Sequence, residues 1–342
     1  MYRWHYIKSR YLYIGIHMMS TALAFSKGLS PFHIVLANPS FPLGGLSAAS
    51  KVEVMDHFKT TDQYLPQVLI PQKLSLEERK IIALSFIEKT RLPVIAKPDR
   101  GVVGIGVIRI DSIENLDEIL NIMPCDYMLQ AYCDFPLEYA IFFCKFPDKE
   151  KGGIVSLSQK LIPFVIGDGS KTVKDLIKLN PVIKYNRNNL ITHARNLDYI
   201  PKSGEKYPIL VQASHTYGCV FKDRNHEITP EMEEWMNEMC SAESEFYFGR
   251  FDLKIKNKDS LKTGRGVKIC ELNGCWSEPI HIYDDKHSFL FAAKEIYRSY
   301  DRAYNIAKLN KKRLKRKIPY RKIITAYRSY MQEKEAIIRI VG

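Results

Sequence analysis

The sequence predicts a protein of mixed α and β structure, and two kinds of pattern lead to this class. Three stretches each contain two short segments with the apolar spacing of strands, joined by a turn, bend or polar connection: 92–98 and 107–110, 127–132 and 137–142, and 249–254 and 268–274. Near the C-terminus, residues 292–309 and 320–340 repeat apolar side chains at helical spacing. The chain has 342 residues, 46% of them hydrophobic, as expected for a globular protein of about two or three lobes.

The first strand pair encloses a glycine-rich turn. The strand 92–98 ends at Lys97-Pro98, and the turn that follows contains Gly101, Gly104 and Gly106. Glycines let backbone N–H groups crowd around phosphates because no Cβ stands in the way. The spacing Gly-x-x-Gly-x-Gly is neither the dinucleotide fingerprint nor a P-loop. By itself the turn therefore indicates either a phosphate-binding loop or a plain hairpin connection.

The second strand pair has the features of an adenosine site. An adenine needs an apolar slot and hydrogen bonds from a backbone hinge, which residues 129–132 are placed to supply, and Glu138 is placed to reach ribose hydroxyls. A plain β-bend is the alternative interpretation of the same residues.

The third strand pair predicts a cluster of oxygen ligands. Pairing the two strands sets Asp252, Glu271 and Asn273 side by side, and Arg250 lies on the face of Asp252. Two carboxylates and an amide suit Mg²⁺, and the arginine suits a phosphoryl group in transfer. A solvated polar face is the alternative, but burying such a set without a cation is costly, and the neighbouring residues have the pattern of buried strands: Leu253, Ile255, Ile269 and Leu272.

In their order along the chain, these segments resemble the ATP-grasp superfamily of carboxylate–amine ligases, which includes D-alanine–D-alanine ligase, glutathione synthetase and cyanophycin synthetase. A Gly-Asp-Gly turn at 167–169, followed by Thr172 and a helical pattern over 173–177, is similar to an element of the cyanophycin-synthetase-like branch. The resemblance covers roughly residues 90–285.

The resemblance implies an α+β fold in which two α+β subdomains clasp ATP. We expect a substrate-side α/β region of reduced size at 1–75, the ATP-grasp domain at 76–300 with its lid at about 95–165, and a basic helical tail at 301–342.

The resemblance also implies a reaction. ATP phosphorylates a carboxylate to an acyl phosphate, and an amine attacks it, so that an amide, ADP and phosphate are formed.

The resemblance also implies roles for single residues. The ATP-binding set is Lys97, Gly101, Gly104, Gly106, Gln130, Ala131, Tyr132, Glu138 and Lys160. Gln130 stands where many relatives have Glu, which leaves the purine preference open. Arg250 corresponds to the arginine that stabilises the acyl phosphate. Asp252, Glu271 and Asn273 correspond to ligands of Mg²⁺ or Mn²⁺.

The substrate side is less sharply indicated. The resemblance places Arg187, Arg195, Ser214 and Ser277 near the acid or the amine, and His215 is either a general base for the amine or a structural histidine. The loop 38–51, with two adjacent glycines, either presents backbone amides to an acid or is a simple turn.

Charge and cysteines bear on location and partners. Of the net charge of +13, +10 belongs to residues 301–342. This tail predicts contact with an anionic membrane or nucleic acid, or a solvated helix packed on the body. The basic, aromatic N-terminus is too short and polar in its apolar part to span a bilayer. Seven cysteines without a Cys-x-x-Cys pair indicate free thiols in a cytoplasmic, and at most membrane-peripheral, enzyme.

The sequence leaves three functions open. The first is the ATP-dependent ligase for small acid and amine substrates. The second is an ATP-grasp enzyme with a thiol or hydroxyl acceptor. The third is a non-catalytic nucleotide-binding module that the basic tail tethers to membrane or nucleic acid. A homodimer is compatible with each of them.

Overall fold

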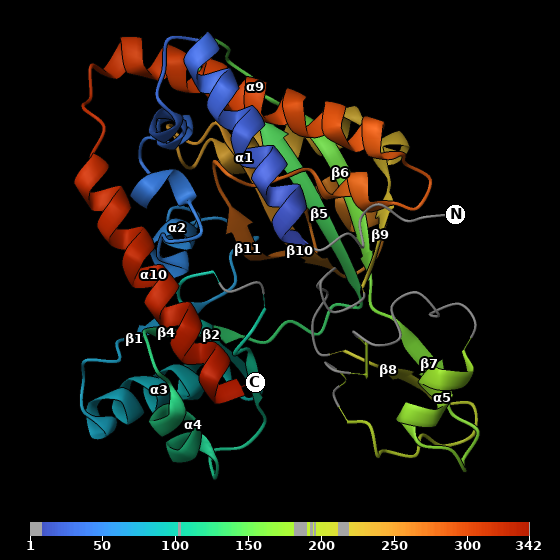
Figure 1. Ribbon diagram of the computed structural model, residues 1–342. Coiled ribbons are helices and arrows are strands. Elements are labelled where there is room, and N and C mark those ends of the chain that lie inside the picture. The colour runs from blue at the N-terminus through green and yellow to red at the C-terminus, as the bar shows by residue number, and fades with distance from the viewer. Residues whose placement is uncertain are drawn as a thin grey trace.

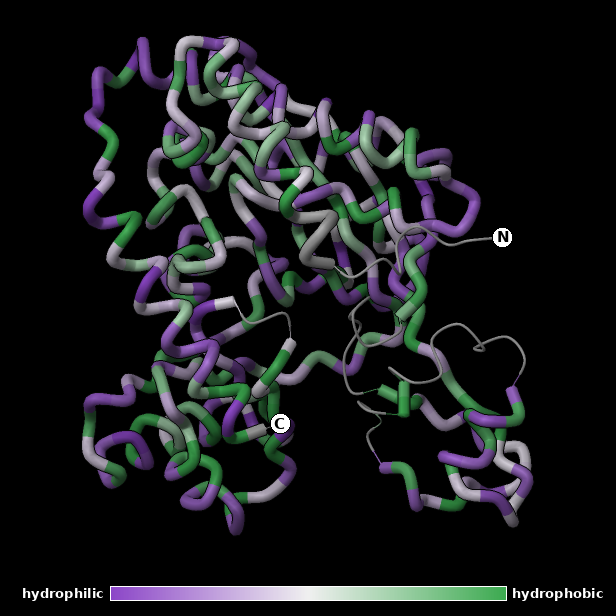
Figure 2. Tube along the Cα trace, in the orientation of Figure 1, coloured by the Kyte–Doolittle hydropathy of each residue, from purple (hydrophilic) through white to green (hydrophobic). Residues whose placement is uncertain are grey.

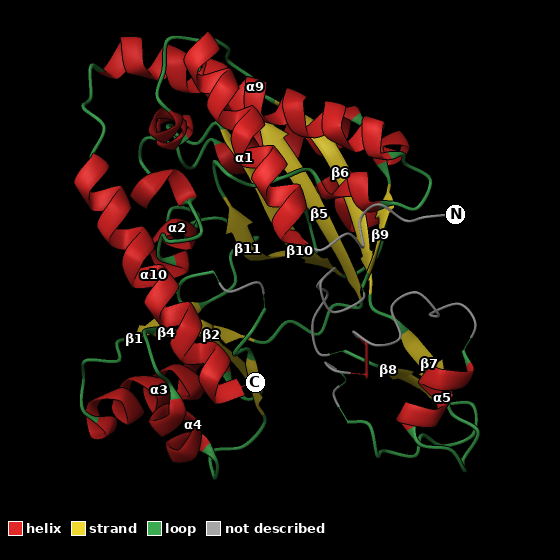
Figure 3. Ribbon diagram, in the orientation of Figure 1, coloured by secondary structure: helices red, strands yellow, loops and turns green. Residues whose placement is uncertain are grey.

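The structure is a computed structural model that describes residues 9–101, 104–180, 190–191, 194, 196–210 and 219–341. It has an α+β fold in which helices surround three antiparallel sheets (Figures 1 and 3). The α+β class predicted from the sequence is confirmed.

The first sheet has four strands in the order β1-β4-β2-β3. Its strands are β1 (Gln67–Ile70), β2 (Val94–Pro98), β3 (Ile108–Ile110) and β4 (Tyr127–Ala131), and α3 (Leu76–Thr90) and α4 (Leu116–Ile122) share its core. The N-terminus of α3 is fixed by a capping box. Glu78 N–H donates to Ser75 Oγ, and Ser75 N–H donates to Glu78 Oε2. The predicted strand, glycine turn and strand are thus present as the pair β2–β3.

The second sheet has five strands in the order β11-β10-β5-β6-β9. They are β5 (Leu137–Cys144), β6 (Gly153–Leu161), β9 (Val220–Asp223), β10 (Phe248–Ile255) and β11 (Val267–Asn273). Side chains of β5 alternate between two cores, because successive residues of a strand point to opposite faces. Tyr139 and Ile141 pack with α7 (Pro230–Cys240), α8 (Asp259–Thr263) and α2 (Lys51–Asp56), whereas Ala140 and Phe142 belong to the opposite core.

That opposite core is covered by α1 (Ser9–Ser26), α9 (Phe289–Leu314) and the 3-10 helices η2 (Pro31–Ala37) and η5 (Ile280–Tyr283). Figure 1 shows α1 and α9 lying over the second sheet. A small third sheet pairs β7 (Phe164–Ile166) with β8 (Lys206–Pro208) beside α5 (Val173–Leu179). Two further 3-10 turns are η3 (Pro42–Gly45) and η4 (Asn225–Glu227).

The C-terminal helices agree with the sequence pattern. Helix α9 is followed by α10 (Tyr320–Val341), which begins directly after Pro319. The segment between them begins with three hydrophilic residues, 315–317 (Figure 2), which are followed by the buried Ile318. No described helix is both long enough and apolar enough to cross a bilayer.

The sheets divide the chain at positions that differ from the expected subdomain limits. The first sheet already begins at β1, whereas β5 and β6, inside the range expected for the lid, belong to the second sheet. Helix α9 also continues through positions 300 and 301. The division into three functional regions stays a prediction.

Candidate active site

The pairing of β10 with β11 brings the predicted oxygen cluster together. Asp252 lies opposite Glu271, and Arg250 lies opposite Asn273, so all four side chains share one face of the second sheet. Asn273 Nδ2 donates to Asp252 Oδ2 at 3.3 Å. The hairpin pattern in the sequence therefore predicted the correct neighbours, while their role as metal ligands stays a prediction.

Asp252 is buried between two cations. Its carboxylate lies 3.0 Å from Lys160 Nζ and 3.0 Å from Arg250 Nε. Burial acts to raise the pKa of Asp252, but Arg250 and Lys160 outweigh it and hold the pKa below its usual range. Arg250 also donates through Nη1 to the carbonyl of Glu278 at 3.0 Å, which fixes the guanidinium beside the carboxylate.

Charged residues continue along the same face toward β5. Glu138 lies opposite both Lys160 and Lys254 in the strand register, and its Oε1 is 3.3 Å from Lys254 Nζ. Burial acts to lower the pKa of Lys254, but Glu138 and other neighbours raise it above its usual value. Lysines alternate here with carboxylates, so the face offers both cationic and anionic groups to a ligand.

Two predicted ATP-binding residues of the first sheet reach the second sheet. Lys97 Nζ donates to Gln130 Oε1 and to the carbonyl of Cys270, both at 3.0 Å, and Gln130 Nε2 donates to the same carbonyl at 3.2 Å. Cys270 is the extra residue at a register shift of β11, where Asp252 pairs with Glu271 and Leu253 with Ile269. Such a bulge leaves a residue outside the strand ladder, and here its carbonyl binds the first sheet.

Other predicted ATP-binding residues lie near the first sheet or its edge. Gly101 N–H donates to the carbonyl of Ser47 at 3.0 Å, while Gly104 and Gly106 have φ of 85° and 75°. Ala131 N–H donates to the carbonyl of Pro66 at 2.9 Å, and the Tyr132 ring lies 4.5 Å from the Arg109 guanidinium carbon. The Ala131 amide is therefore already bonded within the protein.

A pocket lies where the glycine turn, the loop 45–51 and the end of β11 meet. It has an empty volume of about 480 Å³ including its opening to solvent, and its walls include Gly101, Glu271, Asn273, Trp276 and Ser277. Ser277 Oγ donates to the carbonyl of Gly274 at 2.6 Å, so this side chain stabilises the turn after β11.

Lys51 lines this pocket, and the sequence indicated it only as the end of the loop 38–51, without a role for its side chain. Its Nζ donates to the carbonyl of Pro98 at 3.1 Å and is 3.9 Å from Glu271 Oε1. Burial lowers the pKa of Lys51, an effect that Glu271 partly offsets. Nothing near Lys51 in sequence has the pattern of a phosphate or metal motif, so only the packing of α2 against Asp99 brings it to the site. Lys51 N–H donates to the Asp99 carbonyl and Val52 N–H to Asp99 Oδ1.

Four of the predicted substrate-side and catalytic residues lie outside the described residues, so their roles stay predictions: Arg187, Arg195, Ser214 and His215.

The Gly-Asp-Gly turn at 167–169 precedes α5 as expected. Asp168 accepts from Ser170 N–H, Lys171 N–H and Lys171 Nζ, and these bonds lower the pKa of the carboxyl group.

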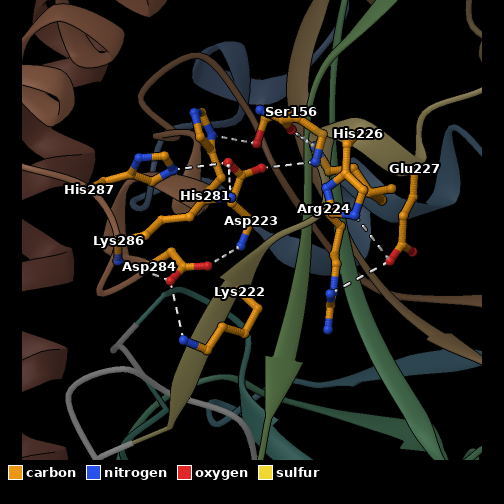
Figure 4. Close-up of polar contacts among 12 residues, drawn as sticks. Ser156, Lys222, Asp223, Arg224, His226, Glu227, His281, Asp284, Lys286 and His287 are labelled. Carbon is orange, nitrogen blue, oxygen red and sulfur yellow. Dashed lines mark hydrogen bonds and ion pairs between the residues drawn. The ribbon is translucent and has the colours of Figure 1, made fainter.

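A second polar cluster surrounds Asp223 at the edge strand β9 (Figure 4). Asp223 Oδ2 is 2.9 Å from His287 Nε2 and 3.0 Å from Lys286 Nζ, and its N–H donates to Asp284 Oδ2. Lys222 pairs with Asp284 at 3.2 Å. All these groups are partnered, and they tie β9 to the segment between η5 and α9, which indicates a structural role.

The donor chemistry of the first cluster fits a hard divalent cation. Asp252, Glu271 and Asn273 present carboxylate and amide oxygens on one sheet face, which Mg²⁺ prefers over nitrogen or sulfur. Within the described ranges, no group of three or more His, Cys, Asp or Glu side chains has the arrangement of a metal site. The cluster has two such residues plus an amide, so a cation here needs further oxygens, such as those of a nucleotide phosphate.

No protein-family model and no curated protein matches the sequence. The chain is similar to the solved structure of a bifunctional glutathione synthetase from Pasteurella multocida, with 16% identity and a TM-score of 0.35 over 77% of this chain and 36% of that one. It is also similar to the VanG D-Ala:D-Ser ligase from Enterococcus faecalis, with 13% identity and a TM-score of 0.41 over 77% of this chain and 63% of the ligase. For the D-alanine–D-alanine ligase from Bacillus anthracis, identity is 12% and the TM-score 0.42, over 80% and 69% of the two chains.

These solved structures are ATP-grasp ligases, the superfamily that the sequence motifs resemble. The chain spans less than two thirds of the length of the first two. Its α+β architecture with antiparallel sheets agrees with the fold class that the sequence predicted.

Proposed function

We propose that this chain is an ATP-dependent ligase that activates a carboxylate as an acyl phosphate and joins it to an amine. The observation that carries the proposal is the meeting of Lys97 and Gln130 from the first sheet with the charged face of the second sheet, through the carbonyl of Cys270. A nucleotide held there lies among cationic groups from both sheets, which is the charge neutralisation that phosphoryl transfer requires.

Each of the described charged side chains has a separate proposed role toward ATP. Lys97 and Lys160 supply positive charge to the phosphates, since one lies at the sheet junction and the other lies against Asp252. Arg250, held by the carbonyl of Glu278, stabilises the charge that develops on the transferred phosphoryl group. Glu138 is placed for ribose hydroxyls, and Lys254 holds its carboxylate in position.

Asp252, Glu271 and Asn273 are the residues that would hold Mg²⁺ or Mn²⁺. A divalent cation bound there neutralises phosphate oxygens and orients the triphosphate. In the described structure Asp252 is paired with Lys160 and Arg250. These two cations are therefore the groups that must share its carboxylate when a metal and a nucleotide bind.

The pocket beside the cluster is the proposed place of the acid. It adjoins Glu271 and Asn273, and Lys51, whose positive charge suits a carboxylate, is one of its lining residues. The acid and the amine are small molecules of unspecified identity. A thiol or hydroxyl in place of the amine, and nucleotide binding without catalysis, remain as the two rival functions.

The test is ADP release that depends on an added acid and an added amine, screened over amino acids, dipeptides and dicarboxylates with Mg²⁺. We expect Asp252→Asn and Glu271→Gln to lower the rate at least about a hundredfold, as removal of a charge-stabilising group does. Asp259→Asn is the matched control, because the Asp259 side chain is 88% exposed and lies outside the site. Circular dichroism and melting curves verify that each variant folds.

The outcomes separate the candidate functions. Wild-type rates in Asp252→Asn would refute the assignment of this cluster. Release that needs a thiol or alcohol would indicate the other acceptors. ATP binding without any release would favour the binding module.

A further inference from the structure

Helix α10 connects the two main parts of the molecule. Ile318, two residues before the helix, and Ile323 in its first turn are buried in the core of the second sheet with residues of α9. Its end lies in the core of the first sheet, where Ile337 is 1% exposed and packs with Ile110 and Tyr127. Figure 1 shows the helix running from one part to the other. The sequence pattern predicted this helix but did not indicate where it docks.

The docked end of α10 contacts both sides of the glycine turn. Glu333 Oε1 is 2.6 Å from Arg100 Nη1, and Arg100 directly precedes Gly101. Four residues later on the helix, Ile337 lies against Gly106, since a Cβ built on this glycine would be 2.9 Å from Ile337 Cγ2. Residues four apart lie on one helix face, so a single face of α10 holds the turn at its start and at its end.

Other contacts also hold the described ends of the turn. Gly101 is bonded to the carbonyl of Ser47, and Gly106 adopts a φ of 75° between Pro98, Tyr127 and Ile337. Arg100 and Glu333 are 30% and 24% exposed, so their ion pair is partly shielded from water. Losing it removes the link between α10 and the residue that precedes Gly101.

We propose that α10 is a positioning element of the nucleotide site, with Glu333 and Ile337 as positioning residues that hold Gly101 and Gly106 in place for the phosphates of ATP. This rests on the proposed function only in taking the glycine turn as the phosphate-binding loop. Nucleotide affinity then depends on the docking of a C-terminal helix that itself carries no predicted ATP ligand.

The experiment measures the affinity of the full chain for MgATP by isothermal titration calorimetry. We expect Glu333→Gln to weaken binding about tenfold, which corresponds to about 1.4 kcal/mol. Glu335→Gln is the matched control, because it makes the same charge change on the same helix at an exposed position. Its affinity should equal that of the wild type.

A charge exchange separates positioning from simple loss of charge. Glu333→Arg should weaken binding, and the added change Arg100→Glu should restore the affinity to within about threefold of the wild type, since the pair forms again with exchanged partners. A purely structural role would lower the melting temperature of Glu333→Gln without changing its MgATP affinity.

Three results would overturn the inference. They are unchanged affinity in Glu333→Gln, an equal loss in Glu335→Gln, and failure of the exchange to restore binding. A wild-type chain that does not bind MgATP would instead overturn the proposed function together with this inference. ATP binding without ligation leaves the role of α10 supported while the ligase proposal falls.

Discussion

Two adjacent glycines, Gly44 and Gly45, allow the turn that borders one side of the candidate pocket. Leu43, Gly44 and Gly45 have φ of 51°, 67° and 76°, a left-handed run that glycine tolerates best. The carbonyls of Gly44 and Gly45 accept from Cys275 N–H and Gly274 N–H. The sequence left open whether this loop is a simple turn or presents amides to an acid. The structure shows a turn that docks through its carbonyls onto the end of β11.

We predict that Gly45→Ala destabilises the protein and also deforms the pocket. Its Cβ would stand 2.9 Å from Gly274 Cα, and the φ of 76° adds strain, so we expect a loss of about 2 kcal/mol in the free energy of unfolding. Gly28→Ala is the control, because Gly28 has a φ of 70° but no atom near its Cβ position. It should lose about 1 kcal/mol. Urea unfolding measures both, and equal losses would contradict the clash.

The burial of one histidine makes the free energy of unfolding depend on pH. His281 is 1% exposed, and its Nδ1 is 2.8 Å from Ser156 Oγ. Burial is the main cause that lowers the pKa of His281 in the folded protein. The unfolded chain therefore takes up the proton first, at a pH of about 6.5. The stability given by neutral His281 is fully present above that pH and is lost as the pH falls toward the folded pKa.

We expect His281→Gln to be less stable than the wild type at pH 7.5 but to lose less stability on acidification to pH 5.5. The difference in slope is at most about 1.4 kcal/mol per pH unit for one proton. Denaturant unfolding at several pH values measures it. Parallel pH curves for the two proteins would show that His281 does not titrate differently on folding.

At the scale of elements, one buried amide joins the turn η3 to the second sheet. Asn38 is fully buried and uses all its bonding groups. Its Nδ2 donates to the carbonyls of Gly44 and Phe248, and its Oδ1 accepts from Tyr247 N–H and Phe248 N–H. The start of β10 and the pocket turn are therefore held by a single side chain.

We predict that Asn38→Ala lowers the free energy of unfolding by about 3 kcal/mol, because several buried backbone groups lose their partner. Asn115→Ala serves as the comparison, since this exposed residue precedes α4 without a side-chain cap. It should change stability by less than about 0.5 kcal/mol. If thermal melting gave similar values for both variants, the bonds of Asn38 would contribute nothing net.

At the scale of the whole molecule, the basic C-terminal region is partly structural. Asn310 is fully buried and its Nδ2 donates to the Leu36 carbonyl, while Arg313 pairs with Glu245. A truncation before Asn310 would remove buried core residues, so its effect could not be assigned to the basic side chains alone. We propose that the exposed lysines of this segment contact an anionic membrane surface: Lys311, Lys312, Lys315 and Lys317.

Changing these four lysines to Gln should abolish retention on phosphatidylserine vesicles at low salt, since each contributes about 1 kcal/mol near an anionic surface. The variant with four Arg keeps the charge and should be retained like the wild type. Cosedimentation at rising salt measures both, and retention should weaken as screening grows. Equal retention of the Gln and Arg variants would exclude this surface.

The sequence by itself determined the strands β2, β3, β4, β5, β10 and β11, the C-terminal helices and the meeting of Asp252, Glu271 and Asn273. Local periodicity and short connections set these features, because neighbouring strands of a hairpin fix their own register. Only the tertiary structure brought Lys51 to Glu271, turned the Cys270 carbonyl toward Lys97, and docked α10 on the glycine turn. These contacts join segments far apart in the chain, and their partners follow from how whole elements pack, which no local pattern encodes.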